Sequence, residues 1–431
     1  MHETEREALP GRPPGKPREG DLQGTGARAF SAFFVRDFRF LWAGAFVSNV
    51  GTWIHNTALF WLVKERTGSD AWVGVVNLAQ FLPVFLLVLA AGALADTLNR
   101  KRLILATQAA MMAGALALAV LSSLDLVNLP VIVGLTAFMG VAFVFNFPAW
   151  RAIVTDLVPP DLILNAVALD AAQFNMARFV GPMLGALVLA VSGATLAFYL
   201  NAVSFMAVIV ALFAIRTKTP PLRGKKGALV RQIAEIISFS WRNPWVRNHL
   251  GVMAVSSLFG LTYLILLPGM ARDVLRGGST VYGILLGATG LGAAISAPLV
   301  TAINRRFREA SIIRWSALAG SLALVAFALS RQLFLSAFLS FLLGASFLML
   351  SSSINAVLQS GVERNMRGRI MSLYILVFQG LYPLGGLLMG FVSDRTSPVD
   401  ALLLGGMVCL FMSTMLFLFP DTLERLDHLE I

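Results

Sequence analysis

Cysteine is almost absent from this sequence, because Cys409 is the only one in 431 residues. A single thiol excludes both a disulfide within the chain and a cysteine metal cluster. The four histidines, His2, His55, His249 and His428, are far apart and show no spacing typical of a metal site. We therefore expect no metal and no other cofactor. The sequence also has no recognisable pair of nucleophile and base, so we do not expect an enzyme.

Charged residues are scarce as well, at 13% of the chain against about 25% in an average soluble protein. Hydrophobic residues make up 57%. Apolar runs of about 20 residues, long enough to cross a bilayer as helices, recur between short charged or Gly/Pro-rich breaks. The sequence therefore predicts an all-α polytopic membrane protein with about 12 transmembrane helices, near residues 38–63, 71–95, 102–123, 130–150, 165–190, 194–215, 248–270, 279–303, 311–330, 333–356, 369–392 and 400–419.

Most of the charge is positive, and the formal net charge is +11. The lysines and arginines fall mainly in the N-terminal segment and in alternate breaks. The other breaks hold Lys64, Arg66, Arg272, Arg276, Arg331 and Arg395. This asymmetry follows the positive-inside rule and predicts a multi-pass protein of the cell membrane, inner or plasma, with both termini in the cytoplasm. The basicity then reflects orientation in the lipid bilayer, and we expect no nucleic-acid partner.

The longest break divides the apolar runs into two sets of six. The predicted units are a disordered cytoplasmic tail (1–30), a first six-helix bundle (31–215), a basic cytoplasmic connector with an amphipathic helix (216–247), a second six-helix bundle (248–420) and a cytoplasmic tail (421–431). Gly181, Pro182 and Gly185 in the first bundle are echoed by Pro383, Gly386 and Gly390 in the second. Two pseudo-symmetric bundles of this kind are typical of secondary transporters, whose binding site lies between the halves at mid-membrane.

The segment GALADTLNRKRL, residues 92–103, resembles the signature loop of the major facilitator superfamily, Gly-x-x-x-Asp-Arg-x-Gly-Arg-Arg. Gly92, Asp96, Arg100 and Lys101 match it in register, whereas Thr97 and Asn99 depart from it. The resemblance implies a cytoplasmic gate, in which Asp96 faces the N-terminus of the eleventh helix around residues 367–369 and the basic residues lock the halves together. The departure at position 97 removes one charged partner of this lock.

A narrower resemblance begins at RDFRFLWAGAFVSNVGTWIHNTALFWLVKERTGSDAWVG, residues 36–74, and continues through residues 145–170 and 175–186. These segments resemble the enterobactin-exporter and macrolide-efflux branch of the same superfamily. The resemblance implies the major facilitator fold and a monomeric exporter of siderophores, macrolides or other small amphipathic compounds, driven by protons.

Charge inside the predicted spans is rare and costly in lipid, so each such residue must face protein or a water-filled cavity. Asp170 is the carboxylate set furthest inside a span, and Arg178 is the base near mid-depth of the same span. Eight residues separate them by about 12 Å along a helix, on neighbouring faces that can look into one cavity. We interpret Arg178 as a cavity charge or a structural arginine, and Asp170 as a proton-coupling candidate or a vestibule residue. His55 is the alternative titrating group, or else a packing residue.

Uncharged polar side chains inside the spans are candidates for contact with a substrate, although many such residues only join helices. Those favoured for the cavity are Asn49, Asn56, Gln80, Asn146, Gln173, Tyr263, Asn355, Gln359 and Gln379, with Tyr382 as a further candidate.

Gly181, Pro182 and Gly185 in the fifth span resemble part of the antiporter motif of drug exporters. Proline bends a helix and glycine lets a neighbouring helix approach, so the motif predicts a bend and a close helix contact. The leading hypothesis is a proton-coupled exporter that works by alternating access. An importer or a lysolipid flippase on the same fold remains open, as does a non-transporting membrane sensor or lipid enzyme.

Overall fold

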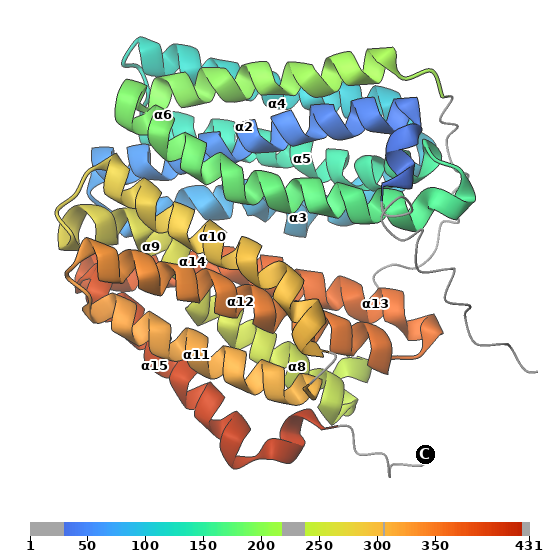
Figure 1. The fold of residues 1–431 in the computed structure, drawn as a ribbon. Coiled ribbons are helices and arrows are strands. Elements are labelled where there is room, and N and C mark those ends of the chain that lie inside the picture. The colour runs from blue at the N-terminus through green and yellow to red at the C-terminus, as the bar shows by residue number, and fades with distance from the viewer. Residues whose placement is uncertain (1–29, 218–237, 305–306, 425–431) are drawn as a thin grey trace, which may run out of the picture.

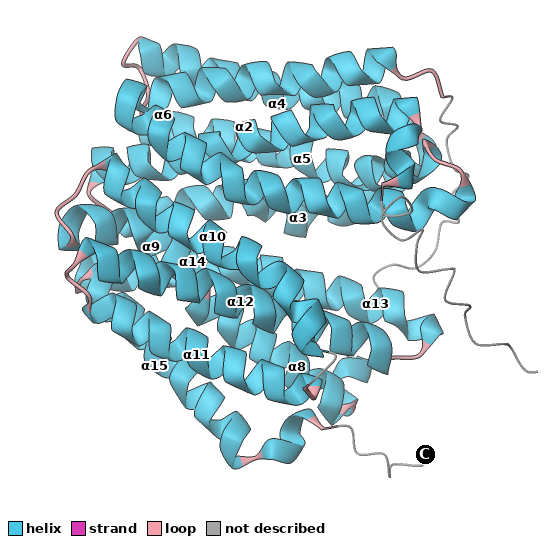
Figure 2. Cartoon of the chain, viewed as in Figure 1, coloured by secondary structure: helices cyan, strands magenta, loops and turns pink. Residues whose placement is uncertain are grey.

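The computed structural model describes residues 30–217, 238–304 and 307–424, with the side chains of residues 88–90, 92–93, 95–96, 297–298, 300–304 and 364–365 left out. Residues 1–29 of the predicted tail at 1–30, the amphipathic helix of the connector and most of the C-terminal tail lie outside the described residues. They stay predictions. Every regular element in the described ranges is helical (Figure 2).

The first group of helices extends from residue 31 to residue 214. It comprises η2 (Ser31–Phe34), α2 (Arg36–Thr67), α3 (Asp70–Thr97), α4 (Arg100–Ser123), α5 (Leu129–Asp156), η3 (Pro160–Leu162) and α6 (Ile163–Ala214). Several helices begin at a polar cap, and the Asn99 and Asn128 side chains accept hydrogen bonds from the backbone three residues on. Gly68, with φ of 67°, ends α2 in the left-handed region, and Gly193, with φ of 74°, divides α6 into two arms.

The second group extends from residue 244 to residue 423. It comprises α8 (Pro244–Val255), η4 (Ser256–Gly260), α9 (Tyr263–Gly269), η5 (Met270–Val274), α10 (Ser279–Asn304), α11 (Glu309–Leu329), α12 (Leu333–Gly361), α13 (Arg364–Ile375), η6 (Leu376–Gly380), α14 (Leu381–Arg395), α15 (Pro398–Leu418) and η7 (Pro420–Leu423). The segments η4, η5 and η6 are π-helical turns. The sequence contained no signal for them.

Ten segments of the described chain are long and apolar enough to cross a membrane. One of them, Pro160–Ala214, is 55 residues long and contains the division at Gly193. The helix α2 is not among the ten, although it covers the first predicted run. The prediction of an all-helical polytopic membrane protein is confirmed.

The two groups lie side by side, with α2 to α6 on one side of the molecule and α8 to α15 on the other (Figure 1). They approach each other at the end that holds the α2–α3 and α14–α15 turns, and they diverge toward the end at which α13 begins. We call these the joined end and the divergent end.

The buried apolar residues reflect the same asymmetry. The largest core cluster contains residues of both groups, including Trp61 of α2 and Tyr282 of α10, whose rings stack at 5.8 Å. Each of the three smaller clusters of described residues belongs to one group, and two of them are larger than the third. One surrounds Phe38 and Ile153 in the first group, and the other surrounds Ile313 and Ile354 in the second. Apolar packing therefore joins the groups at one end, while each group has its own core at the other.

Candidate functional site

Helix α6 contacts helices of both groups through opposite faces of its first arm. On one face, a Cβ added at Gly181 would lie 2.3 Å from Cβ of Trp53, and one at Gly185 would lie 3.0 Å from Thr57. On the other face, Met183 and Ala186 contact Gly287 and Gly283 of α10. These glycines allow α6 to lie close to both groups at once.

The antiporter-like motif thus forms a close helix contact with α2. Pro182 lies inside α6, and the position at which the backbone torsions of α6 leave the helical range is Gly193. The contribution of Pro182 to a bend, and of the motif to export, stays a prediction.

Helices α3 and α14 form the second close contact between the groups. A Cβ at Gly74 would lie 2.7 Å from Cα of Leu387, and one at Gly390 would lie 2.6 Å from the carbonyl oxygen of Asp70. Backbone meets backbone here without intervening side chains, so a larger residue at either glycine would push the two groups apart.

A buried group of charges lies at the joined end. The Nζ atom of Lys64 is 3.0 Å from Oδ1 of Asp70 and 2.7 Å from Oδ2 of Asp273. The side chains of Lys64 and Asp70 are only 2% and 1% exposed, whereas that of Asp273 is 40% exposed. Because Asp273 belongs to the second group, the amine of Lys64 joins the two groups through an ion pair.

Three further residues of the second group complete this contact. Ser393 donates a hydrogen bond of 2.6 Å to Asp70, and Arg272 donates one of 2.6 Å to the carbonyl oxygen of Lys64. Asp394 accepts a hydrogen bond of 2.7 Å from the backbone amide of Asp70. We call Lys64, Asp70, Arg272, Asp273, Ser393 and Asp394 the charge cluster of the joined end.

Sequence reasoning missed this cluster, because it treated Lys64 and Arg272 only as loop charges. Arg272 and Lys64 are 208 positions apart, so their spacing carries no signal. The one local signal is the turn after Lys64, where Gly68 and the cap residue Ser69 return the chain so that Asp70 faces the lysine.

Asp170 lies inside the first group, where it is 7% exposed. Its Oδ1 accepts hydrogen bonds from Nε1 of Trp150 at 3.1 Å and from Nε2 of Gln173 at 3.3 Å. Gln173 in turn accepts a hydrogen bond of 3.0 Å from Asn49. Helices α2, α5 and α6 therefore contribute to one polar chain around this carboxylate, which includes two of the predicted cavity residues.

Arg178 lies farther along the same arm of α6 and is only partly buried. Its guanidinium stands over the ring of Trp53, at 5.8 Å from the centroid. Its charge also acts on the hydroxyl groups of Tyr263 in α9 and Tyr382 in α14. The structure does not pair Arg178 with Asp170, because the carboxylate is bound by Trp150 and Gln173 of the first group, while the arginine has neighbours from both groups.

His55 is 2% exposed and packs against Phe198, with 4.8 Å between the ring centroids. Neither of its ring nitrogens has a hydrogen-bond partner among the residues that the structure describes. The ring thus occupies an apolar position within the first group.

The remaining cavity candidates are mostly paired with neighbours. Gln80 donates to Asn56 at 3.4 Å, Asn146 to Thr107 at 2.8 Å, and Gln359 to Asn355 at 2.7 Å. The hydroxyl of Tyr263 donates to Thr289 at 3.4 Å, and Gln379 is exposed within η6. All of these pairs except Gln359–Asn355, which lies within α12, join neighbouring helices. Gln379 and Gln359 are the candidates left most exposed.

The predicted gate residues lie at the divergent end. Arg100, which is 4% exposed, forms a short ion pair with Asp156 of α5, and Lys101 donates to the carbonyl oxygen of Ile215 at 3.0 Å. Both partners belong to the first group, so the structure does not bring Arg100 and Lys101 to α13. Gly92 and Asp96 lie in α3, but their side chains are outside the described set.

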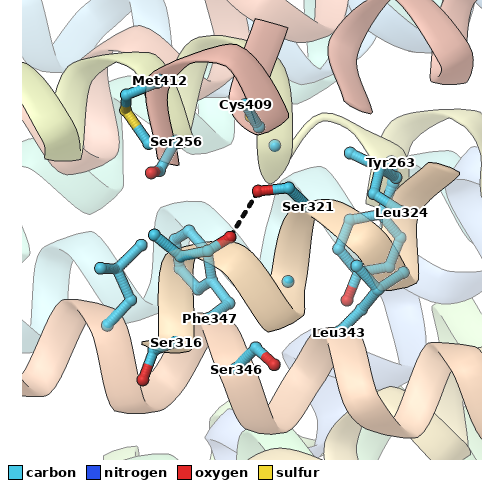
Figure 3. A pocket seen from close by; sticks show the side chains of 14 residues that line it. Ser256, Tyr263, Ser316, Ser321, Leu324, Leu343, Ser346, Phe347, Cys409 and Met412 are labelled. Carbon is cyan, nitrogen blue, oxygen red and sulfur yellow. Dashed lines mark hydrogen bonds between the residues drawn. The ribbon is translucent and has the colours of Figure 1, made fainter. Parts of the chain in front are cut away.

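A small pocket lies within the second group, between η4, α11, α12 and α15 (Figure 3). Serines from these helices line it, and Ser321 donates a short hydrogen bond to the carbonyl of Ala317. Tyr263 lies at one side of the pocket (Figure 3). In the described part of the chain, no group of His, Cys, Asp or Glu side chains is arranged to hold a metal ion.

Two apposed groups of membrane helices, joined at one end and diverging at the other, define a polytopic transporter. A family model described as "transmembrane secretion effector" matches residues 27–429. The chain belongs to this family, which is a branch of the major facilitator superfamily, and it is a transporter of the efflux type and not an enzyme.

Named relatives match along most of the chain. The chain is 24% identical to the staphyloferrin A transporter of Staphylococcus aureus, over 90% of this chain and 99% of that one. It is 25% identical to the multidrug efflux pump Tap of Mycolicibacterium fortuitum, over 81% and 87% respectively. It is 23% identical to macrolide efflux protein A of Streptococcus pyogenes, over 86% and 92%.

A solved structure shows the same fold. The chain is similar to a bacterial homolog of the human lysosomal transporter Spinster in an inward-facing, unoccupied conformation. The TM-score is 0.70 at 12% sequence identity, covering 90% of this chain and 96% of that one.

Proposed function

We propose that this protein is a monomeric, proton-coupled exporter of a small amphipathic compound, which it moves across the cell membrane by alternating access. Its family and its relatives, which include two efflux proteins and a siderophore transporter, support export of such a compound. The observation that carries alternating access is the core of the molecule, which is shared between the groups at the joined end and separate at the divergent end.

In this proposal the chain crosses the membrane twelve times, with six spans in each group. The helix α2 and the two arms of α6 on either side of Gly193 each form one span, in addition to the nine other apolar segments. The basic breaks then lie at the divergent end, which supports a cytoplasmic location for that end and for both termini. In this proposal the conformation is open to the cytoplasm.

Opening to the outside requires the contacts of the joined end to separate. The charge cluster, the α3–α14 contact and the α6–α10 contact would all break, while the divergent ends of the groups come together. Arg100 and Lys101 would then approach α13, which forms the cytoplasmic gate that the superfamily motif implies. In the present state they bind Asp156 and Ile215 instead.

Asp170 is the leading candidate for proton coupling. Both of its donors bind Oδ1, and no described residue donates a hydrogen bond to Oδ2. Oδ2 can therefore accept a proton without loss of an existing hydrogen bond. Release of that proton on the other side of the membrane would couple the polar chain between α2, α5 and α6 to transport.

The test uses the full chain in proteoliposomes with an imposed proton gradient, and export of pyrenebutyrate, a small amphipathic fluorophore, is measured by fluorescence. We expect Asp170→Asn to abolish the dependence of export on the gradient. Asp161→Asn is the matched control, because Asp161 is an exposed carboxylate at the start of the same arm, and it should retain that dependence. An unchanged gradient dependence in Asp170→Asn would exclude Asp170 as the proton carrier.

The import and flippase alternatives predict different transport results. An importer would accumulate pyrenebutyrate in the opposite direction under the same gradient. A flippase would move a fluorescent lysolipid between leaflets and would not transport a soluble compound.

A further inference from the structure

The charge of Arg178 is not balanced by a carboxylate in the described part of the chain. Within the described residues, no ion pair includes this guanidinium. It stands over the ring of Trp53, and its charge acts on the hydroxyl groups of Tyr263 and Tyr382. The nearest carboxylate along α6, Asp170, is bound by Trp150 and Gln173. An arginine held in the interior of a membrane protein without an anion is costly, because neither lipid nor aromatic rings can replace the lost hydration.

Arg178 also lies where the two groups meet. The next residue, Phe179, contacts Gly290 of α10, and three residues on, Gly181 contacts Trp53 of α2. The tyrosines on which the charge acts belong to α9 and α14 of the second group. Arg178 therefore lies on an arm of α6 that contacts α2 of the first group and α10 of the second, as expected of a central transport site.

The two tyrosines follow irregular helix segments. The π-helical turn η4 ends at Gly260, just before Tyr263, and η6 ends at Gly380, just before Tyr382. Single π-turns inside α-helices occur frequently at functional sites, where they reorient the side chains that follow. This placement is independent of the charge of Arg178 and points to the same location.

We propose that the exported compound is an organic anion whose carboxylate or phosphate group binds Arg178, while its apolar part lies on Trp53 and Phe174. This inference rests on the proposed function, because it names the substrate class of the same transport site. The guanidinium offers several donors in a planar fork that matches carboxylate and phosphate oxygens. Trp53 and Phe174, whose rings meet at 6.4 Å, provide an adjacent aromatic surface, and Phe174 is 44% exposed.

A cationic substrate does not fit this position. It would be repelled by Arg178, and no carboxylate in the described structure shares the arginine's surroundings. A neutral amphipathic compound could bind the aromatic surface but would leave the guanidinium without a partner. The arrangement therefore selects for negative charge.

The test compares three probes that share one aromatic body: pyrenebutyrate, pyrenebutanol and pyrenebutyl-trimethylammonium. Binding to the full-length protein in nanodiscs is measured by pyrene fluorescence anisotropy. We expect the anion to bind at least about tenfold more tightly than the alcohol, and the cation to bind more weakly than both. Arg178→Gln should remove this order, and Arg178→Lys should restore part of it. Equal binding of the three probes by the unmodified protein would overturn the inference, as would an unchanged order in Arg178→Gln.

The matched control is Arg151→Gln. Arg151 also stands over an aromatic ring, at 5.3 Å from Phe147, but it is exposed near the divergent end of α5. It should keep the order of the three probes. Thermal unfolding of each variant shows whether Arg178→Gln is folded, and the Arg178→Lys variant provides the same comparison if it is not.

A second arm distinguishes a soluble anion from a lipid headgroup. Fluorescent lysophosphatidylglycerol is offered to the same variants in place of pyrenebutyrate. If binding of pyrenebutyrate depends on Arg178, the substrate is a soluble organic anion. If only the binding of the lysolipid depends on Arg178, the inference of a soluble anion is overturned in favour of a lipid. If pyrenebutyrate binds through Arg178 but no gradient drives its export, the proposed function fails and the anion site stands.

Discussion

The ion pair between Lys64 and Asp273 provides the sharpest test of alternating access. Replacing Asp273 with Asn removes one charge from the second group and leaves the pair between Lys64 and Asp70, which lies within the first group, in place. The buried amine therefore keeps a counterion, and we expect the variant to fold. The change should weaken only the contact between the groups.

The size of the effect follows from the burial of the two partners. Breaking a fully buried ion pair costs about 3–5 kcal/mol, whereas an exposed pair contributes about 0–1 kcal/mol. Lys64 is 2% exposed and Asp273 is 40% exposed, so the pair falls between these limits. We expect a loss of about 1–2 kcal/mol in the joined state and none in the state where the groups have separated. The equilibrium should shift about 5–30-fold toward opening at the joined end.

The measurement is the distance between spin labels at Glu65→Cys and Arg395→Cys, by pulsed electron resonance, in a Cys409→Ser background. Both label positions are exposed, and they belong to different groups at the joined end. We expect Asp273→Asn to add a population at longer distance. The control is Asp400→Asn, because its carboxylate accepts a hydrogen bond from the Ser397 hydroxyl and its amide donates one to that hydroxyl, both at the start of α15. The reasoning is refuted if Asp273→Asn leaves the distance distribution unchanged, or if Asp400→Asn changes it equally.

Three further predictions concern packing and buried polar groups. Gly390→Ala should lower the melting temperature by the equivalent of about 1–3 kcal/mol, because the added Cβ would lie 2.6 Å from the α3 backbone. Gly251→Ala, with open space around the glycine, should not lower it. Equal effects of the two changes in thermal unfolding would count against the α3–α14 contact. Arg100→Met should destabilise the first group by about 2–4 kcal/mol in the same assay, since it leaves Asp156 without its partner, whereas the exposed Arg102→Met should have little effect. His55→Phe should retain proton-driven export of pyrenebutyrate, because the ring packs on Phe198 and has no hydrogen-bond partner within the described residues. Loss of export in a folded His55→Phe variant would identify His55 as the titrating group instead of Asp170.

The sequence by itself determined the features that depend on local composition. The length of each hydrophobic run predicts a span. The turn after α2 and the break in α6 both occur at a glycine with positive φ, Gly68 and Gly193. The motifs around residues 36–74 and 92–103 led to the superfamily, which the family model then confirmed. All of these signals lie within a few tens of residues, so they can be read without knowing which helices are neighbours.

Only the tertiary structure decided which polar residues meet. Arg178 could be placed at mid-depth from the sequence, but its neighbours Trp53, Tyr263 and Tyr382 come from three other helices. The helical spacing of Asp170 and Arg178 lets both look into one cavity, and the structure gives Asp170 the partners Trp150 and Gln173. The two positions are close along one helix, but they differ in the helices that they face.

The physical reason is the solvent around a membrane helix. In water, an apolar stripe shows which face of a helix is buried, because the opposite face must be polar. In lipid, both the outer surface and the packed interior are apolar, so this periodicity no longer marks the contact face. The length of a hydrophobic run therefore remains a readable signal in the sequence. Packing decides how each helix is rotated, and it thereby decides the charge cluster of the joined end and the surroundings of Arg178.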